Sequence, residues 1–276
     1  MKFTKMHGAG NDYIFIDCLK EKVADPASLS RAMSDRHFGI GGDGIILILP
    51  AESADFRMRI FNADGSEAEM CGNGIRCVGK YVYDRKYTSK AEIRIDTLAG
   101  ILPITLHASN GRVDTVTVDM GCPRLQRGEI PMTGPAGQVI AEEIEAGGRK
   151  FKVTAVSMGN PHCVIFVDQV ENFEVGFYGP LIENYPVFPS RTNVEFVEVL
   201  SRSEVSQRTW ERGSGETWAC GTGASATAVA GVLNGKTERR VTIHLRGGDL
   251  NMEWAENNHV YMTGPAVEVF SGEWLD

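Results

Sequence analysis

The sequence Cys71-Gly72-Asn73-Gly74 recurs as Cys220-Gly221-Thr222-Gly223, and this repetition sets the interpretation of the whole chain. From 71 to 220 the offset is 149 residues, and the same offset carries Gly10-Asn11 onto the identical pair Gly159-Asn160. It also relates Arg59 to Arg208, Phe61 to Trp210 and Glu67 to Glu216. Several ordered matches at one offset predict two homologous halves.

The hydrophobic pattern predicts a mixed α/β (α+β) fold. Segments in both halves alternate or run apolar as strands do, namely 14–17, 45–49, 57–62, 92–96, 113–120, 153–156, 165–168, 194–199, 240–245 and 259–262. One helix is expected after each Cys-Gly tetrapeptide and another over 26–36. Residues 224–233 are small and apolar nearly all round, which predicts a buried helix. Each half is therefore expected to be a strongly curved sheet packed around a central helix.

The repeat also sets the expected domains. The first covers 1–118 and carries Cys71, and the second covers 119–264 and carries Cys220. The stretch 131–148, rich in Gly and Pro, is expected to form a hairpin excursion at the start of the second half. The tail, 265–276, is expected to rejoin the first domain.

The composition excludes several classes of protein. Lys and Arg number 28 against 36 Asp and Glu, a net charge of −8, which disfavours a general nucleic-acid or membrane-surface binder. The beginning of the chain lacks the apolar core of a signal peptide, and the aliphatic run 45–49 is too short to span a bilayer, so we expect a cytoplasmic protein. The six cysteines form no CxxC pair, so we expect free thiols and no metal site.

The two Cys-Gly-x-Gly turns indicate acid–base chemistry. A helix N-terminus presents unpaired N–H groups and partial positive charge, which should lower a thiol pKa and can hold a carboxylate. Two such turns facing one another across a cleft would place one sulfur on each face of an amino-acid α-carbon. One thiolate could then remove the α-proton while the opposite thiol supplies another, with no metal or pyridoxal phosphate. A single Cys-Gly-x-Gly turn would more often be structural, but here the turn occurs twice at the offset of the repeat.

Other motifs are weaker. The stretch Gly39-x-Gly41-x-x-Gly44 matches a dinucleotide-binding pattern but leads into a strand instead of a helix, so we expect a turn lining the cleft. His162 is open to a catalytic, a ligand-binding or a buried structural role. Arg212 could bind a carboxylate through two hydrogen bonds, or it could form a surface ion pair.

Together these motifs resemble the diaminopimelate epimerase family over essentially the full length. The matching stretches are residues 6–12, 61–67, 70–74, 159–162, 191–195, 211–213 and 220–223. The resemblance implies two barrel-like, mostly antiparallel sheets, each around a central helix, with the active site in the cleft between them. It implies interconversion of LL-2,6-diaminopimelate and meso-diaminopimelate by two thiols, without a cofactor, in the supply of lysine and peptidoglycan precursors. We also expect a homodimer.

The resemblance also implies roles for individual residues. Cys71 and Cys220 would be the acid–base pair. The reacting carboxylate would be held around Gly72, Asn73, Gly221 and Thr222, and the remaining substrate contacts would be Asn11, Asn62, Asn160, His162, Asn193, Glu211 and Arg212. Arg212 would bind the distal carboxylate. Some members of the family carry Gln at the position of Gly44, so a side-chain contact at that position is lost here.

Two alternatives remain open at this stage. Proline racemases and hydroxyproline epimerases resemble the chain less, because they typically carry His where this chain has Asn73, and a racemase with a broader range of amino acids is a further option. A binding protein that has lost catalysis is the alternative from another class. Retention of both Cys71 and Cys220 argues against it, since a binding protein needs neither thiol.

Overall fold

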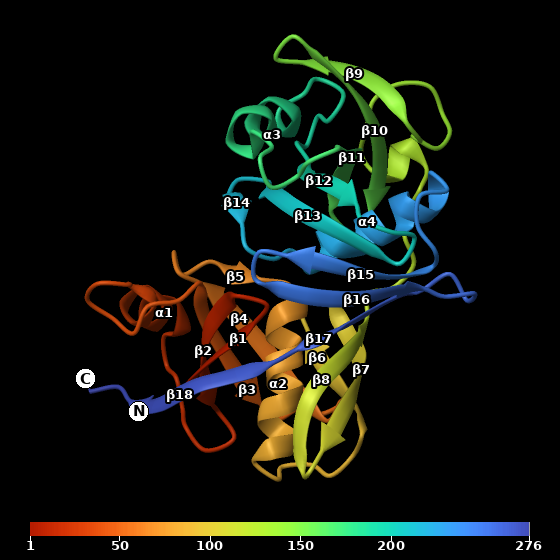
Figure 1. The fold of residues 1–276 in the computed structure, drawn as a ribbon. Helices are drawn as coiled ribbons and strands as arrows, with labels where there is room; N and C mark the ends of the chain where they lie inside the picture. The colour runs from red at the N-terminus through yellow and green to blue at the C-terminus, as the bar shows by residue number, and fades with distance from the viewer. Residues whose placement is uncertain (276) are drawn as a thin grey trace. The chain divides into compact units, whose positions relative to one another are not determined.

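The computed structural model describes residues 1–275, and these divide into two compact units (Figure 1). The first unit comprises residues 1–119 together with the chain from Thr263 onward, and the second comprises residues 120–262. The divisions therefore fall after Asp119 and Met262, against 118 and 264 in the prediction from the sequence.

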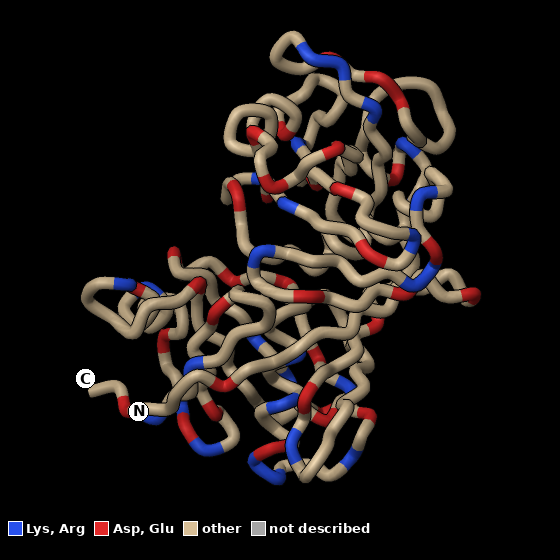
Figure 2. Tube along the Cα trace, viewed as in Figure 1, with Lys and Arg blue, Asp and Glu red and all other residues tan. Residues whose placement is uncertain are grey.

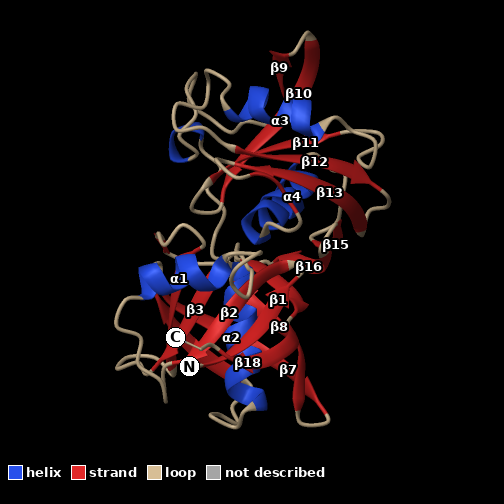
Figure 3. Cartoon of the chain, turned by 90° about the vertical axis from the view of Figure 1, so that its left-hand side faces the viewer, coloured by secondary structure: helices blue, strands red, loops and turns tan. Residues whose placement is uncertain are grey.

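The first unit is a curved sheet around one helix. Its elements are β1 (Lys2–Gly8), β2 (Asn11–Asp17), α1 (Pro26–Ser34), β3 (Gly44–Leu49), β4 (Phe56–Asn62), β5 (Glu67–Ala68), α2 (Gly72–Asp84), β6 (Glu92–Thr97), β7 (Gly100–Ser109), β8 (Arg112–Asp119) and β18 (Val267–Glu273). Strands of this unit flank α2 on several sides (Figure 3). β18 pairs antiparallel with β1, so the last strand lies in the sheet of the first unit.

The second unit repeats this plan. It contains a short 3-10 helix (Arg127–Glu129), β9 (Glu142–Ala146), β10 (Arg149–Ser157), β11 (Pro161–Phe166), α3 (Val175–Glu183), β12 (Asn193–Val199), β13 (Glu204–Glu211), β14 (Gly215–Thr217), α4 (Gly221–Leu233), β15 (Arg240–Leu245), β16 (Gly248–Trp254) and the first half of β17 (Val260–Pro265). α4 packs against β10, β11, β12, β15 and β16, in the role that α2 has in the first unit.

Strand pairing confirms that the two units are homologous. β2 and β3 are parallel, β3 and β4 antiparallel, and β4 and β6 parallel. The corresponding pairs β11–β12, β12–β13 and β13–β15 have the same directions. Even an ion pair is repeated at the offset of 149. Arg59 Nε lies 2.7 Å from Glu67 Oε1, and Arg208 Nε lies 2.7 Å from Glu216 Oε1.

The helix that follows each Cys-Gly turn is as buried as its sequence predicts. Ala224, Ala226 and Val229 of α4 are almost entirely inaccessible to solvent, as are Ile75 and Val78 of α2. α4 ends where expected, with Asn234 as its C-cap and Gly235 in the left-handed region at φ +65°. Burial of these helices holds the residues at their N-termini against the strands of the same unit.

Several parts of the fold were not predicted from the sequence, among them the strands β7, β13 and β16. The helix α3 was not predicted, because Gly176, Gly179 and Pro180 all disfavour a helix interior. Packing overrides this preference, since a Cβ on Gly179 would lie 2.6 Å from the Trp210 ring. The 131–148 excursion is an irregular stretch that ends in β9 and the turn into β10.

The distribution of charge agrees with the composition. In both units, acidic and basic residues are interspersed along the chain (Figure 2). Among the helices of the described residues, none is long and apolar enough to cross a membrane.

Candidate active site

Cys71 caps the N-terminus of α2. It has extended backbone angles of φ −138° and ψ 115°, and its Sγ accepts a hydrogen bond from Gly74 N at 3.4 Å. Gly74 allows this close packing, because a Cβ there would lie 2.6 Å from Ile46 Cδ1. The thiol also donates to Asn11 Oδ1 at 3.2 Å. Cys71 as a residue is partly buried.

Cys220 occupies the same place at the N-terminus of α4. Its backbone angles are φ −125° and ψ 111°, and Gly223 N lies 3.4 Å from its Sγ. A Cβ on Gly223 would lie 2.6 Å from Glu195 Oε1, so glycine is again required by a close neighbour. Thr222 Oγ1 lies 3.4 Å from the sulfur. The two units thus present thiols with matching geometry.

The expected thiolates are not favoured by these environments. Burial raises the pKa of Cys71, although the Gly74 and Asn73 N–H groups, the Tyr13 hydroxyl and the Arg76 charge lower it. Burial raises the pKa of Cys220 well above its ordinary value, and the charges of Glu211 and Glu195 raise it further. The prediction that the helix ends would lower both thiol pKa values is therefore wrong for the unliganded protein, because desolvation outweighs the N–H groups.

A buried, hydrogen-bonded pair of side chains supports the second thiol. His162 Nδ1 lies 2.8 Å from Glu195 Oε1, and both side chains have 0% exposure. His162 Nε2 lies 3.0 Å from Asn160 Oδ1, and Asn160 Nδ2 donates to Thr222 Oγ1 at 3.3 Å. His162 therefore holds Asn160 and lies entirely inside the second unit.

The remaining residues predicted for the second unit lie where the start of β12 meets the end of β13. Asn193 is buried, donating to Pro161 O at 2.9 Å and accepting from Arg212 N at 2.9 Å. Arg212 is exposed, and its Nη1 donates to Ser190 O at 2.9 Å. Glu211 hydrogen-bonds Thr217 and Cys220, and burial raises the pKa of its carboxyl group.

In the first unit the predicted residues are only partly brought together. Asn73 Nδ2 donates to Asn11 Oδ1 at 3.3 Å, which joins both residues to Cys71. Asn62 ends β4, and its Nδ2 donates to Ser66 Oγ at 3.0 Å. Gly44 pairs with Asn62, and a Cβ at position 44 would lie 2.1 Å from Phe61 O, so this backbone has no room for a side chain at position 44.

The sequence reasoning missed several supporting residues. Arg76 of α2 has 0% exposure and donates to Gly72 O at 3.2 Å and to Asn73 Oδ1 at 3.0 Å. Two further residues, Tyr13 and Glu195, could have been found from the offset of 149. That offset relates Tyr13 to His162 and Ile46 to Glu195. Each of these pairs occupies equivalent positions beside its thiol, but the second unit has an imidazole and a carboxyl group where the first has a phenol and an alkyl chain.

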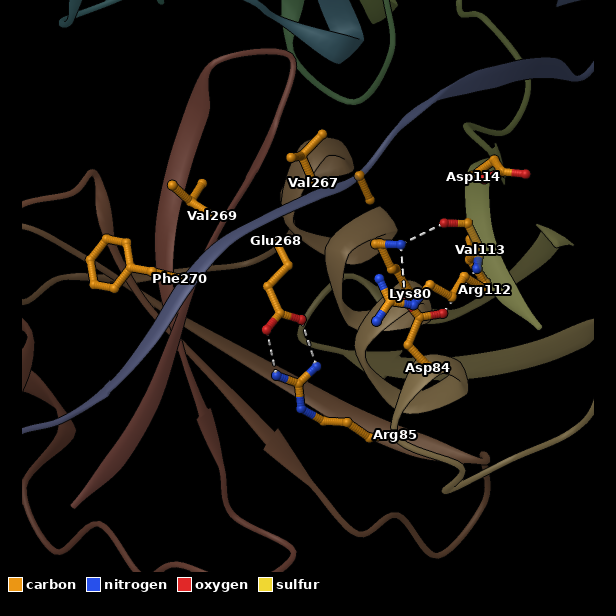
Figure 4. Close-up of a pocket in the computed structure, with 11 residues that line it drawn as sticks. Lys80, Asp84, Arg85, Arg112, Val113, Asp114, Val267, Glu268, Val269 and Phe270 are labelled. Carbon is orange, nitrogen blue, oxygen red and sulfur yellow. Dashed lines mark hydrogen bonds and ion pairs between the residues drawn. The ribbon is translucent and has the colours of Figure 1, made fainter. Parts of the chain in front are cut away.

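A hollow of about 730 Å³ lies elsewhere in the first unit, between α2, β8 and β18 (Figure 4). Lys80 and Asp84 of α2 form an ion pair at 2.8 Å there, and Arg85 pairs with Glu268 of β18 at 2.9 Å. None of the predicted site residues lines this hollow.

The buried His162–Glu195 pair should contribute strongly to stability. We expect Glu195→Ala to lower the free energy of unfolding of the second unit by about 1–3 kcal/mol, because it leaves His162 Nδ1 buried without its hydrogen-bond partner. Urea unfolding followed by tryptophan fluorescence measures this. The matched control is Glu253→Ala, which removes an exposed ion pair with Arg240 and should cost about 1 kcal/mol or less. Equal costs for the two variants would contradict the assigned role of the buried pair.

The fold and the paired thiol sites define the class of protein: a duplicated α/β fold with one Cys-capped helix in each unit. Solved structures with this fold include a PhzF-family phenazine biosynthesis protein from Bacillus anthracis, 17% identical, with a TM-score of 0.72 and coverage of 100% of this chain and 99% of the other. A predicted epimerase from Pseudomonas aeruginosa is 16% identical, with a TM-score of 0.71 and coverage of 100% and 99%.

Within this class, the chain belongs to the diaminopimelate epimerase family, whose model matches residues 3–126 and 154–269. Diaminopimelate epimerase of Agathobacter rectalis is 60% identical to it, over 99% of each chain. The enzyme of the same name from Pelotomaculum thermopropionicum is also 60% identical, again over 99% of each chain.

Proposed function

We propose that this protein is a diaminopimelate epimerase that interconverts LL- and meso-diaminopimelate in the supply of lysine and peptidoglycan precursors. Family membership over the full chain supports the substrate. The observation that carries the mechanism is that each homologous unit places a thiol at the N-cap of its enclosed helix, with the sulfur 3.4 Å from a backbone N–H.

In the proposed mechanism, Cys71 and Cys220 act on opposite faces of one α-carbon. One sulfur, as thiolate, takes the α-proton, and the other, as thiol, donates a proton to the opposite face, which inverts the centre. Proton removal builds negative charge on the adjacent carboxylate. Backbone N–H groups around Gly72, Asn73, Gly221 and Thr222 would stabilise that charge, which is the contribution that a metal or pyridoxal phosphate makes in other enzymes.

The rest of the substrate would be held by the polar residues placed around the two thiols. We propose direct contacts from Asn11, Asn62, Asn160, Asn193, Glu211 and Arg212. Arg212 carries an exposed guanidinium, which suits the distal carboxylate. For His162 we propose an indirect contribution through Asn160, because its ring is fully buried.

Chiral chromatography of diaminopimelate tests the function directly. Enzyme dialysed against a chelator should convert LL-diaminopimelate to a mixture with the meso form, without added pyridoxal phosphate. L-Proline and L-lysine serve as comparison substrates and should remain unchanged. Racemisation of proline in preference to diaminopimelate, or activity that returns only with a metal or pyridoxal phosphate, would contradict the proposal.

The raised thiol pKa values predict how the rate depends on pH. Burial favours the neutral thiols of Cys71 and Cys220, so the thiolate needed as base forms at higher pH than for an ordinary cysteine. We expect kcat/KM, which reports the free enzyme, to rise from neutral into alkaline pH. A rate that is already constant through neutral pH would mean that one thiolate is preformed.

We further propose that the protein is a cytoplasmic homodimer. Six free cysteines are compatible with a reducing compartment. The strand β18 exposes Val267, Val269 and Phe270 at 40%, 55% and 46%, an apolar strip that supports contact with a second copy. Sedimentation of the wild type and of Phe270→Asp tests this, because a dimer through β18 should dissociate in the variant.

A further inference from the structure

Asp43, which precedes β3, lies at the centre of a polar network in the first unit. Its Oδ2 accepts from Asn11 Nδ2 at 2.6 Å and from Asp12 N at 3.1 Å. Its Oδ1 accepts from Arg36 at 3.0 Å, and Arg36 also binds Asp12 at 2.8 Å. The far end of the Asn11 amide, Oδ1, accepts from Cys71 Sγ at 3.2 Å and from Asn73 Nδ2 at 3.3 Å.

The chemistry of these partners fixes the orientation of the Asn11 amide from two sides. A carboxylate can only accept hydrogen bonds, so Asp43 requires the NH2 group of Asn11. A guanidinium can only donate, so Arg76 requires the carbonyl oxygen of Asn73, and Asn73 then turns its NH2 group toward Asn11. Both requirements place the Asn11 carbonyl oxygen beside Cys71.

We propose that Asp43 is a positioning residue that holds the Asn11 carbonyl toward Cys71, so that the resting enzyme keeps Cys71 as a thiol ready to donate a proton. A carbonyl oxygen accepts a hydrogen bond from S–H but gives none to a thiolate. Turning the amide would present NH2 to the sulfur and stabilise the thiolate instead. The inference rests on the proposed function only in treating Cys71 as the proton donor.

The second unit lacks this arrangement, although Asn160 is the counterpart of Asn11. Asn160 bonds Thr222 and His162, and the Thr222 hydroxyl, which can donate, lies beside Cys220. The titratable groups that face Cys71 itself are Tyr13 of β2 and Arg76 and Cys77 of α2. Of these, Tyr13 and Arg76 favour the thiolate form of Cys71. The carbonyl of Asn11 favours the thiol form and so acts against them.

Alkylation of Cys71 tests the proposal without any substrate, so its failure is distinguishable from failure of the proposed function. The native protein is treated with iodoacetamide over a pH series, and labelling at each cysteine is quantified by peptide mass spectrometry. In Asp43→Ala we expect Cys71 to react about tenfold faster than in wild type at neutral pH, a shift of its titration by about one unit. Labelling of Cys220 should not change.

Two controls separate amide orientation from charge and from unfolding. Asp43→Asn removes the charge but keeps an oxygen that accepts from Asn11, so its Cys71 should react within about twofold of wild type. Asp55→Ala is the matched control for Asp43→Ala, because Asp55 makes the same kinds of contact away from Cys71. It pairs with Lys90 at 2.6 Å and accepts a hydrogen bond from Arg94 N at 2.8 Å. Asp55→Ala should behave as wild type.

The outcomes are distinct. Equal acceleration in Asp43→Asn and Asp43→Ala would show a charge effect alone and overturn the positioning role, as would wild-type labelling in Asp43→Ala. Labelling of the buried Cys77 reports unfolding. If Asp43→Ala exposes Cys77, Asp43→Ser is used instead, because a hydroxyl keeps a polar side chain at position 43 but can both donate and accept, and so does not dictate the orientation of the Asn11 amide.

Discussion

Cys71→Ala and Cys220→Ala should each reduce epimerisation by at least about 10³-fold while leaving the far-ultraviolet circular dichroism unchanged. Inversion needs a proton acceptor on one face of the α-carbon and a donor on the other, and water has no fixed position from which to replace either. The measurement is the initial rate of meso-diaminopimelate formation from the LL form.

The matched control for these variants is Cys77→Ala. Cys77 lies in α2 only two turns from Cys71, but it is fully enclosed and burial raises its pKa to about 12. Its substitution should lower stability slightly and leave kcat close to wild type. Full activity in Cys71→Ala, with loss in Cys77→Ala, would show that the wrong sulfur has been assigned.

Arg212→Met should raise KM for diaminopimelate and lower kcat as well. The distal carboxylate lies far from the reacting carbon, but its binding energy helps to position that carbon between the two thiols. We expect kcat/KM to fall by an amount equivalent to about 2–5 kcal/mol, because the charge on the substrate would be left without its partner. Steady-state kinetics in both directions measure the change.

Arg202→Met is the control for Arg212→Met. Arg202 also lies in the second unit, and its side chain is 66% exposed beside Glu238 at 3.8 Å. Removing it changes the net charge by the same amount without touching the proposed site, so kcat and KM should both match wild type. If Arg212→Met also matches wild type, the distal carboxylate is bound elsewhere.

The part of the fold that could be predicted is the part that the repeat and the hydrophobic pattern encode. The buried helix after Cys220 and the strand β15 that follows it were predicted from local pattern alone, whereas β13 and β14, which precede the helix, were not. The helix α3 was not predicted either, because Gly179 and Pro180 argue against it, and its place is set by packing: Gly179 lies on Trp210, and Val175, Tyr178 and Ile182 are buried in the core of the second unit. Predictions from local preference fail where such a tertiary contact decides.

The candidate site was predictable in its thiols but not in its electrostatics. A helix N-terminus favours thiolate, but the degree of burial that opposes it depends on strands distant in sequence. His162 and Glu195 likewise lie on neighbouring parallel strands, β11 and β12, whose register the sequence does not reveal. The same holds for Asp43, which reads as a turn residue until its bond to Asn11 is seen.

Epimerisation of LL-diaminopimelate in deuterium oxide, stopped at low conversion, tests the two-thiol mechanism most directly. If separate thiols serve the two faces, the first meso product should carry one solvent deuteron at the inverted centre. The recovered LL substrate should carry none, because the thiol that removed its proton returns that same proton. Meso product that retains the original α-hydrogen, or deuterium appearing equally early in recovered LL substrate, would contradict the assignment of Cys71 and Cys220 as separate acid and base.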